Sequence, residues 1–238
     1  MQSSPEPGLV REFRSAFKER RLPLEQEQAE AMALYLQLLE RWNETHNLTA
    51  IRDRQAAILR HFVEPAIALP LLSGAGPVLL DAGSGAGIPG LPLKILDPDR
   101  TCLLVEANSK KAAFLREVVE RVGLEDVEVL EGRFEELVGS GELAPPINIL
   151  TARAWTGWGD LLGLAARLMV PGGRAVIFIG EETMRALRRH LGAGPGIAPR
   201  TGDPAWMPAA RAGWQIRRVL PLPHLDRASI VALELPAE

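Results

Sequence analysis

A glycine-rich stretch in the first half of the chain limits the possible folds most strongly. The sequence LLDAGSGAGIPGLPLKI spans residues 79–95 and places four glycines within eight residues, directly after a short apolar run. Gly85, Gly87 and Gly90 form a G-x-G-x-x-G pattern, in which glycine lets the backbone turn tightly and approach a ligand. Pro89 fits the first position of a following helix, whose amides would face a polar ligand. The stretch therefore predicts a strand, a ligand-binding turn and a helix.

Strand and helix patterns alternate after this point. Helical patterns over 109–122 and 158–169 follow predicted strands, which is typical of right-handed βαβ units around a parallel sheet. Residues 191–213 are rich in Gly, Pro and Ala and are expected to form a loop. The runs 214–222 and 228–235 leave no room for a helix between them and are expected to pair as an antiparallel hairpin at the sheet edge. The five predicted parallel strands are 78–81, 101–106, 127–130, 147–152 and 174–179.

This pattern predicts an α/β fold, the Rossmann-like, mostly parallel seven-stranded sheet of class I methyltransferases that use S-adenosyl-L-methionine (SAM). The first part of the chain reads as helix, because apolar residues in 31–42 recur at i, i+3, i+4 and i+7 and a second helical pattern covers 55–69. We expect an N-terminal helical region over residues 1–72 and a methyltransferase domain over 73–238.

Composition and charge exclude several other classes of protein. The single cysteine, Cys102, allows neither an intrachain disulfide nor a cysteine zinc site, and the four histidines lack metal-ligand spacing, so no metal is expected. The longest uncharged stretch, 65–80, is broken by prolines and glycines, and the first ten residues do not resemble a secretory signal. We therefore expect a cytoplasmic protein with no membrane contact. The net charge of −3 means that a nucleic-acid partner must meet a local basic patch.

Two carboxylates bear on the ligand of the glycine loop, and only Asp81 distinguishes SAM from NAD. Glu106 ends the second predicted strand, where a carboxylate would accept hydrogen bonds from ribose hydroxyls of either cofactor. Asp81 lies directly ahead of the glycines, where it would face the phosphates of a dinucleotide. SAM instead presents an ammonium and a sulfonium, which a nearby carboxylate favours. The pattern favours SAM, and a purely structural turn is the remaining alternative.

Several longer motifs carry a more specific resemblance. In chain order they are WNETHNLTAIRD (42–53), HFVEP (61–65), DAGSGAGIPGLPLKI (81–95), KKAAFLREV (110–118), GRFEEL (132–137) and ARAW (152–155). Together they resemble the RsmG family, also called GidB, over nearly the whole chain from about residue 34 to 235. These bacterial enzymes methylate N7 of a guanine in a loop of small-subunit (16S) ribosomal RNA.

The resemblance implies roles for individual residues. Gly83 and Ile88 match loop positions that contact SAM, and Glu106 matches the acid at the ribose. Phe134 and Glu135 match the pair that flanks the adenine. Arg153 matches an arginine at the methyl-transfer site and is the predicted catalytic residue. The full set predicted to bind the cofactor is Asp81, Gly83, Ser84, Gly85, Gly87, Ile88, Glu106, Arg133, Phe134, Glu135 and Arg153.

The chain departs from the family pattern on the side expected to hold the substrate. Asn148 and Ala152 replace an aspartate and a serine of the fourth strand, Ile179 replaces a lysine of the fifth, and Ala228 replaces a histidine after Arg227. Two alternatives to the methylation of 16S rRNA therefore stay open. One is a SAM-dependent methyltransferase with another RNA or small-molecule substrate, and the other is a non-catalytic SAM-binding factor of ribosome assembly.

The expected partner is 16S rRNA or one of its assembly intermediates, with no DNA and with the protein as a monomer. Guanine N7 carries a lone pair and no proton, so the reaction needs no general base, and the target must be an exposed or extruded base. Candidate phosphate contacts, with a solvated helix face as the alternative, are Arg52, Arg54, Arg60, Arg185, Arg188 and Arg189.

Four residues near these motifs have structural interpretations beside the functional ones. His61 is expected to pack between the helical region and the sheet. Trp155 and Trp158 are candidates to stack on a base, although packing is the more usual role of a tryptophan beside a strand end. Arg153 has the alternative of pairing with Glu106 or with Glu135.

Overall fold

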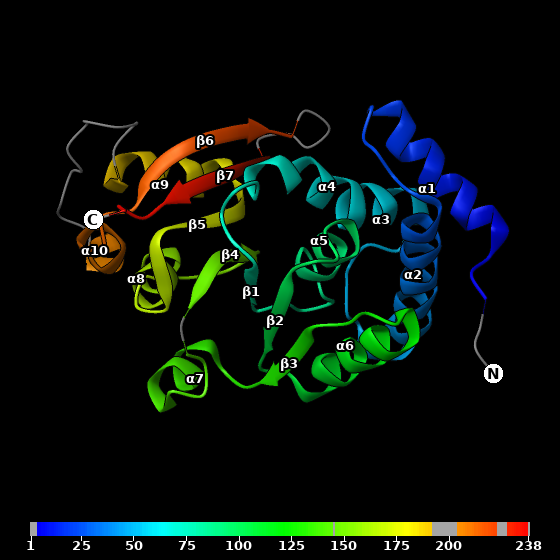
Figure 1. The fold of residues 1–238 in the computed structure, drawn as a ribbon, viewed down its shortest axis with the longest axis horizontal. Helices are drawn as coiled ribbons and strands as arrows, with labels where there is room; N and C mark the ends of the chain where they lie inside the picture. Colours follow the sequence, from blue (N-terminus) through cyan, green and yellow to red (C-terminus); the bar gives the residue numbers. More distant parts are fainter. Residues whose placement is uncertain (1–3, 145, 192–203, 223–227, 238) are drawn as a thin grey trace.

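The computed structural model describes residues 4–144, 146–191, 204–222 and 228–237. At its centre is a seven-stranded sheet with the order β3-β2-β1-β4-β5-β7-β6 (Figure 1). Strands β1 to β5 run parallel, and β7 lies antiparallel between β5 and β6. The predicted α/β class and the closing antiparallel pair are confirmed. The strands are β1 (Val78–Ala82), β2 (Thr101–Glu106), β3 (Val127–Glu131), β4 (Ile147–Arg153), β5 (Met169–Gly180), β6 (Gln215–Pro221) and β7 (Ala228–Glu234).

Helices cover both faces of the sheet and give three layers (Figure 1). Successive side chains of a strand point to opposite faces, so Leu79 belongs to the core on one side and Leu80 to the core on the other. The first face is covered by α5 (Gly90–Leu96), α6 (Ser109–Val122) and the N-terminal helices. The second face is covered by α7 (Phe134–Ser140), α8 (Trp158–Ala165), α9 (Glu181–Leu191) and α10 (Met207–Arg211).

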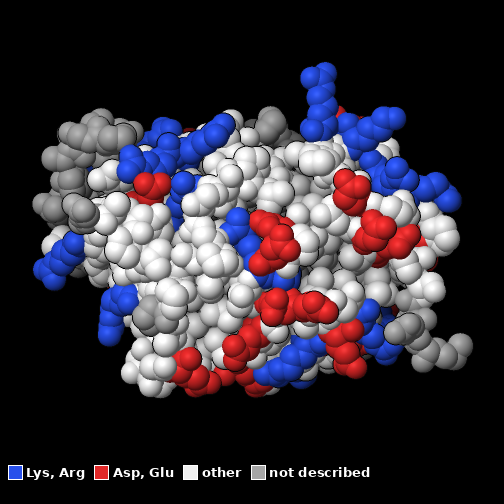
Figure 2. All heavy atoms as spheres, viewed as in Figure 1, with Lys and Arg blue, Asp and Glu red and all other residues white. Residues whose placement is uncertain are grey.

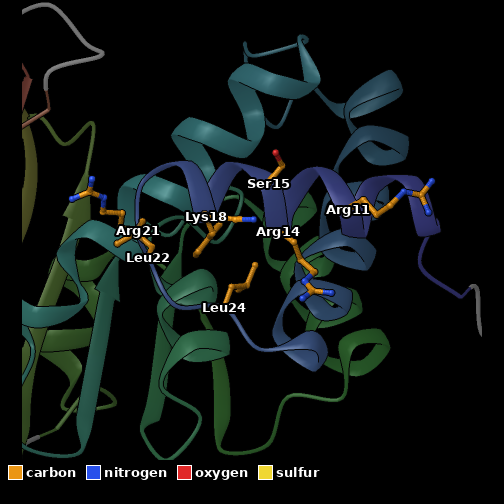
Figure 3. Close-up of a pocket in the computed structure, with 8 residues that line it drawn as sticks. Arg11, Arg14, Ser15, Lys18, Arg21, Leu22 and Leu24 are labelled. Atoms are coloured by element: carbon orange, nitrogen blue, oxygen red, sulfur yellow. The ribbon is translucent and has the colours of Figure 1, made fainter.

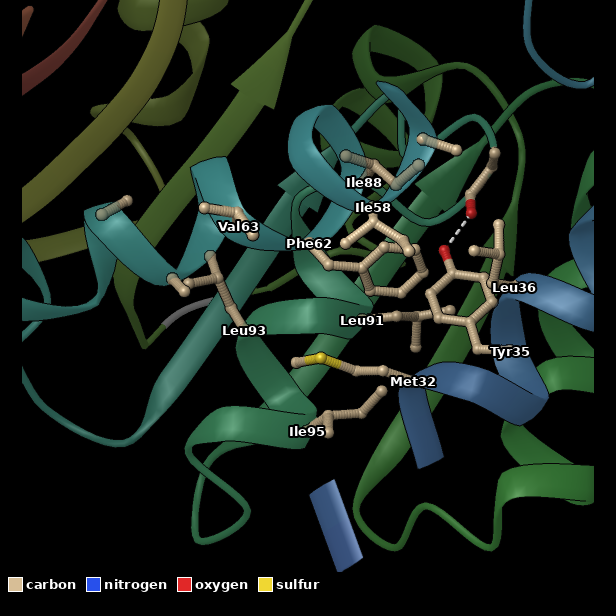
Figure 4. Close-up of a cluster of buried hydrophobic side chains, with 14 of the residues drawn as sticks. Met32, Tyr35, Leu36, Ile58, Phe62, Val63, Ile88, Leu91, Leu93 and Ile95 are labelled. Carbon is tan, nitrogen blue, oxygen red and sulfur yellow. Dashed lines mark hydrogen bonds between the residues drawn. The ribbon is translucent and has the colours of Figure 1, made fainter. Parts of the chain in front are cut away.

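The N-terminal helices share one hydrophobic core with the first face of the sheet. Figure 4 shows Tyr35 and Phe62 packed beside Leu91 of α5, and the two aromatic rings meet edge to face with centroids 5.2 Å apart. The predicted boundary between residues 72 and 73 falls just before β1, and it stays a prediction. The N-terminal elements are α1 (Pro7–Glu19), α2 (Gln26–His46), α3 (Arg54–Ala57), the π-helical segment η1 (Ile58–Val63), α4 (Glu64–Ala68) and the 3₁₀ turn η2 (Leu69–Leu71).

Two of the predicted elements differ from those in the structure. The helix expected over 158–169 ends at Ala165, because Met169 already pairs with Ile147 at the start of β5. A loop over the whole of 191–213 is wrong for its last part, where η3 (Pro204–Trp206) and α10 form because Trp206 and Ala209 bury against α8. Residues 192–203 of that prediction lie outside the described part.

Candidate functional site

A cleft of about 340 Å³ lies where β2, β3 and β4 end. It sits beside the point at which the strand order reverses around β1, which is where ligands bind in open α/β sheets. Its volume is within the range of small-molecule sites. Of the predicted cofactor residues, Gly83, Glu106, Arg133, Phe134, Glu135 and Arg153 line it, together with Val105, Ala107, Gly132, Ala154, Trp155 and Thr156.

Glu106 is held in a fixed orientation at the end of β2. Its Oε2 accepts a hydrogen bond from the Gly85 amide at 2.7 Å, and its Oε1 accepts one from the Asn108 amide at 2.8 Å. Each carboxylate oxygen has a second lone-pair site, so Glu106 can still accept hydrogen bonds from a ligand in the cleft. The same carboxylate therefore orders the glycine loop and offers acceptors to a ribose.

The glycine loop comes so close to an aromatic side chain that residue 83 has no room for a Cβ atom. Gly83 has a φ of +67°, and a Cβ built there would lie 2.8 Å from the ring of Trp155. Trp155 in turn meets Phe134 edge to face, with ring centroids 6.1 Å apart. Trp155 thus forms part of the cleft wall, whereas Trp158 is buried in the core as its packing interpretation predicts.

Asp81 lies beneath the glycine loop and does not line the cleft. Its carboxylate is fully buried and accepts hydrogen bonds from Thr151 Oγ1 at 2.8 Å and from the Gly90 amide at 3.2 Å. Burial raises the pKa of Asp81 to about 7, although these hydrogen bonds act in the opposite direction. Pro89 caps α5 and does not occupy its first position, because the first helical amide is that of Gly90, which Asp81 holds.

The remaining residues of the glycine loop make contacts within the protein and do not line the cleft. Ser84 donates its hydroxyl hydrogen to the Asp81 carbonyl at 2.9 Å. Gly87 lies against Tyr35, whose hydroxyl donates to the Ala86 carbonyl. Ile88 is buried in the core of the first face. The structure therefore divides the predicted cofactor residues into one group that lines the cleft and a second group, Asp81, Ser84, Gly85, Gly87 and Ile88, that shapes the loop.

Arg153 is fixed by a carboxylate that the sequence analysis did not select. Its Nη2 lies 3.1 Å from Glu64 Oε2, and its Nη1 donates to the Arg60 carbonyl at 2.6 Å. Glu64 is 1% exposed, so this ion pair is shielded from water. The proposed partners Glu106 and Glu135 are not the ones used. The HFVEP motif contains Glu64 and was the available signal for it.

His61 packs between the N-terminal helices and the sheet, as expected. It is buried, and its Nε2 lies 3.1 Å from the hydroxyl oxygen of Thr49. Burial, together with the positive charges of Arg153 and Arg60, lowers the pKa of His61 to about 3. The imidazole is therefore neutral near pH 7 and does not serve as a proton donor there.

The positions that depart from the family pattern do not all lie at the cleft. Asn148 is near the start of β4, and its Oδ1 accepts a hydrogen bond from the amide of Val78, the first residue of β1. These strand starts lie at the opposite end of the strands from the cleft. The expectation that Asn148 faces the substrate is therefore wrong. Ala152 is buried in the core, Ile179 is buried near the end of β5, and Ala228 pairs with Gly180. Arg227 is outside the described residues.

Most arginines proposed as phosphate contacts are used within the molecule. Arg52 donates to the Asn43 carbonyl and to Asn47, and Arg54 forms two hydrogen bonds with Glu40. Arg60 and Arg185 form ion pairs with Glu64 and Glu181, respectively. These four support the structural alternative. The exposed Arg188 and Arg189 form no ion pair with another described residue.

The described residues contain neither a candidate membrane span nor a candidate metal cluster. No helix there is long and apolar enough to cross a membrane. No group of three or more His, Cys, Asp or Glu side chains there has the arrangement of a metal site.

Comparison with known proteins gives consistent matches. The GidB family model, described as rRNA small subunit methyltransferase G, matches residues 28–191. Proteins named ribosomal RNA small subunit methyltransferase G are similar in sequence. The one from Leptothrix cholodnii is 39% identical over 164 residues, which is 67% of this chain and 73% of the relative. The one from Stenotrophomonas maltophilia is 38% identical over 188 residues, or 79% and 76%.

Solved structures share the fold at low sequence identity. A SAM-dependent methyltransferase from Aquifex aeolicus superposes with a TM-score of 0.51 at 18% identity, covering 75% of this chain and 93% of that one. An rRNA methylase from Streptococcus thermophilus superposes with a TM-score of 0.52 at 15% identity, covering 72% and 95%. At such identities these matches support the fold alone.

Proposed function

Because the chain belongs to the GidB family of rRNA small subunit methyltransferases G, we propose that it transfers a methyl group from SAM to N7 of a guanine in 16S rRNA. The observation that carries this proposal is the cleft at the reversal of strand order. There an oriented acid, an aromatic wall and a paired arginine meet at the ends of three parallel strands.

The side chains that line the cleft have the chemistry that SAM binding requires. Glu106 keeps acceptor sites for the ribose hydroxyls. Phe134 and Glu135 lie after β3, where they would flank the adenine, and Arg133 stands beside them at the rim. When bound, SAM supplies a methyl group on a positively charged sulfur.

The loop residues act through the backbone in this proposal. Gly83 lets the chain pass against Trp155, and Gly85 is hydrogen-bonded to Glu106. Asp81 orders the turn from below through the Gly90 amide. The loop separates the Asp81 carboxylate from the ligand, so in its ionised form Asp81 would favour a bound cation through space and not by direct contact.

Arg153 orients the target base. Two of its five N–H groups are engaged by Glu64 and Arg60, and the others can donate to an acceptor such as guanine O6. Because N7 carries a lone pair and no proton, the protein has to align the base and need not remove a proton. Alignment of this kind accounts for large rate enhancements. A cytoplasmic location and a monomeric state remain predictions.

The direct test is methylation in vitro. Small ribosomal subunits from a strain that lacks this gene should accept a methyl group from SAM, and nuclease digestion should yield 7-methylguanosine. Arg153→Ala should lower the rate by on the order of a hundredfold, as expected when a reacting group is misplaced, while calorimetry should still detect SAM binding. Protein that binds SAM but modifies no ribosomal particle would support the non-catalytic alternative. Another methylated product would support a different substrate.

A further inference from the structure

Helix α1 and the turn that follows it carry four exposed basic side chains. Arg11, Arg14 and Lys18 follow the spacing i, i+3 and i+7, which places them on the same side of α1, and Arg21 lies two residues after the helix ends at Glu19. Figure 3 shows them spread along α1 and the turn after it, around a hollow of about 610 Å³. The other residues of this hollow are Ser15, Phe17, Leu22 and Leu24, so no acidic residue lines it. We call these four side chains the basic row.

The basic row is not neutralised by the protein itself. Among the described residues none of the four forms an ion pair, and the one hydrogen bond within the hollow joins Arg14 to the neutral side chain of Gln26. The two acidic residues of α1 point elsewhere, since Glu12 accepts a hydrogen bond from Gln55 and Glu19 pairs with Arg20. Figure 2 shows Lys and Arg side chains projecting from this part of the surface.

Arg21 occupies a backbone conformation that favours glycine. Its φ is +55°, and the Arg21 and Leu22 amides donate to the Lys18 and Phe17 carbonyls in the manner of a glycine helix end. Helices α6 and α7 of the same chain end at Gly123 and Gly141 with φ of +74° and +78°. An arginine in this position strains the backbone, and the chain gains a fourth cation on the same face.

The opposite face of α1 is already used in the core. Phe13 and Phe17 are fully buried, and Phe13 meets Phe62 of η1 edge to face at 4.9 Å. An amphipathic helix that lies on a membrane needs its apolar face for the lipid, and this face is not available. What α1 offers to a partner is therefore charge on a rigid helix.

We propose that the basic row binds the phosphate backbone of the rRNA substrate, outside the nucleotide that enters the cleft. The helical part of the row, from Arg11 to Lys18, extends over about 10 Å at 1.5 Å per residue, and cations in such a row bind successive phosphates without reading the sequence. α1 packs on η1, which also supplies the carbonyl that holds Arg153. RNA held by the row is thus attached to the same rigid unit as the methyl-transfer site. This inference rests on the proposed function.

The sharpest test is Arg21→Gly, because it separates folding from binding. Glycine removes the backbone strain, so the variant should be at least as stable to urea as the parent protein. It also removes one phosphate contact, so affinity for 16S rRNA in a filter-binding assay should fall about four- to sixfold at roughly 0.15 M salt. The slope of log affinity against log salt should become shallower by about 0.7 to 0.9.

A triple variant and a control complete the experiment. Arg11→Gln, Arg14→Gln and Lys18→Gln together should lower rRNA affinity by on the order of a hundredfold, with SAM affinity unchanged. Arg20→Gln loses the same charge from the same end of α1 but from a residue paired with Glu19, and it should bind rRNA as the parent does.

Binding and methyl transfer are measured separately, so that the two proposals can fail separately. If the row variants lose rRNA affinity but neither they nor the parent protein methylates the rRNA, the inference about the basic row is supported and the proposed reaction is refuted. If the row variants bind rRNA as tightly as the parent, the inference is overturned. It is also overturned if the row variants lose only binding to phosphatidylserine vesicles, because the partner is then an anionic membrane.

Discussion

Asp81→Asn should change how the stability of the protein depends on pH. Asp81 is fully buried beneath the glycine loop, and its pKa is raised from 3.8 to about 7 because burial disfavours the charged form. Asparagine has nearly the same shape. Its Oδ1 can accept from the Gly90 amide, and its Nδ2 can donate to Thr151 Oγ1. The substitution therefore removes the titration and keeps the hydrogen-bonded turn.

The sign follows from proton binding. Between the pKa of Asp81 in the unfolded chain and its pKa in the fold, the folded protein holds the proton more tightly, so folding is favoured at the acidic end. Each pH unit of increase within this window lowers the free energy of unfolding by about 1.4 kcal/mol. From about pH 5 to about pH 7 the parent protein should lose about 2 kcal/mol relative to Asp81→Asn, and the difference should level off about one pH unit above the folded pKa.

Urea denaturation of both proteins at several pH values measures this difference. Asp160→Asn changes the net charge equally at an exposed carboxylate and serves as the control for the change in net charge. The reasoning about Asp81 is refuted if the difference between the parent and Asp81→Asn changes by less than about 0.5 kcal/mol across the window.

Two further predictions concern the glycine loop. Gly83→Ala should weaken SAM binding at least about tenfold in calorimetry, since its Cβ would lie 2.8 Å from Trp155 and a tenfold change corresponds to only about 1.4 kcal/mol. Gly74→Ala has a similar φ of +71° with no atom within 4 Å of the new Cβ, and unchanged SAM affinity there would show that the contact with Trp155 is responsible. Tyr35→Phe should lower the free energy of unfolding by about 1 to 3 kcal/mol, because the buried Ala86 carbonyl loses its donor. A Tyr35→Phe protein as stable as the parent in urea would contradict this role.

The sequence predicted the order of the elements well. Apolar residues alternate with period 2 in the strands and recur with period 3.6 in the helices, and glycine and proline interrupt both. These are local properties of the backbone. The ends of elements were less predictable, as at Met169 and Trp206, because pairing with a neighbouring strand or burial against a helix decided them.

Part of the candidate site could also be predicted from the order of the strands along the sequence. A residue at the carboxyl end of a parallel strand meets its neighbours at one edge of the sheet, so Glu106 and Arg153 were expected around one cleft, and the family resemblance added Phe134. The basic row was not among the predicted phosphate contacts, and the structure reveals it by showing that no described carboxylate pairs with it.

The sequence by itself thus determined the fold class, the family and the strand ends that meet at the cleft. The tertiary structure decided which side chains of distant segments touch. In the tertiary structure Asp81 is buried under the loop and Arg153 pairs with Glu64 from α4. Asn148 lies at the start of β4, away from the cleft. The physical reason is that the periodicity of apolar residues is a local property of the chain and can be read from neighbouring residues. The partner of a buried charge, in contrast, depends on how whole helices pack against the sheet.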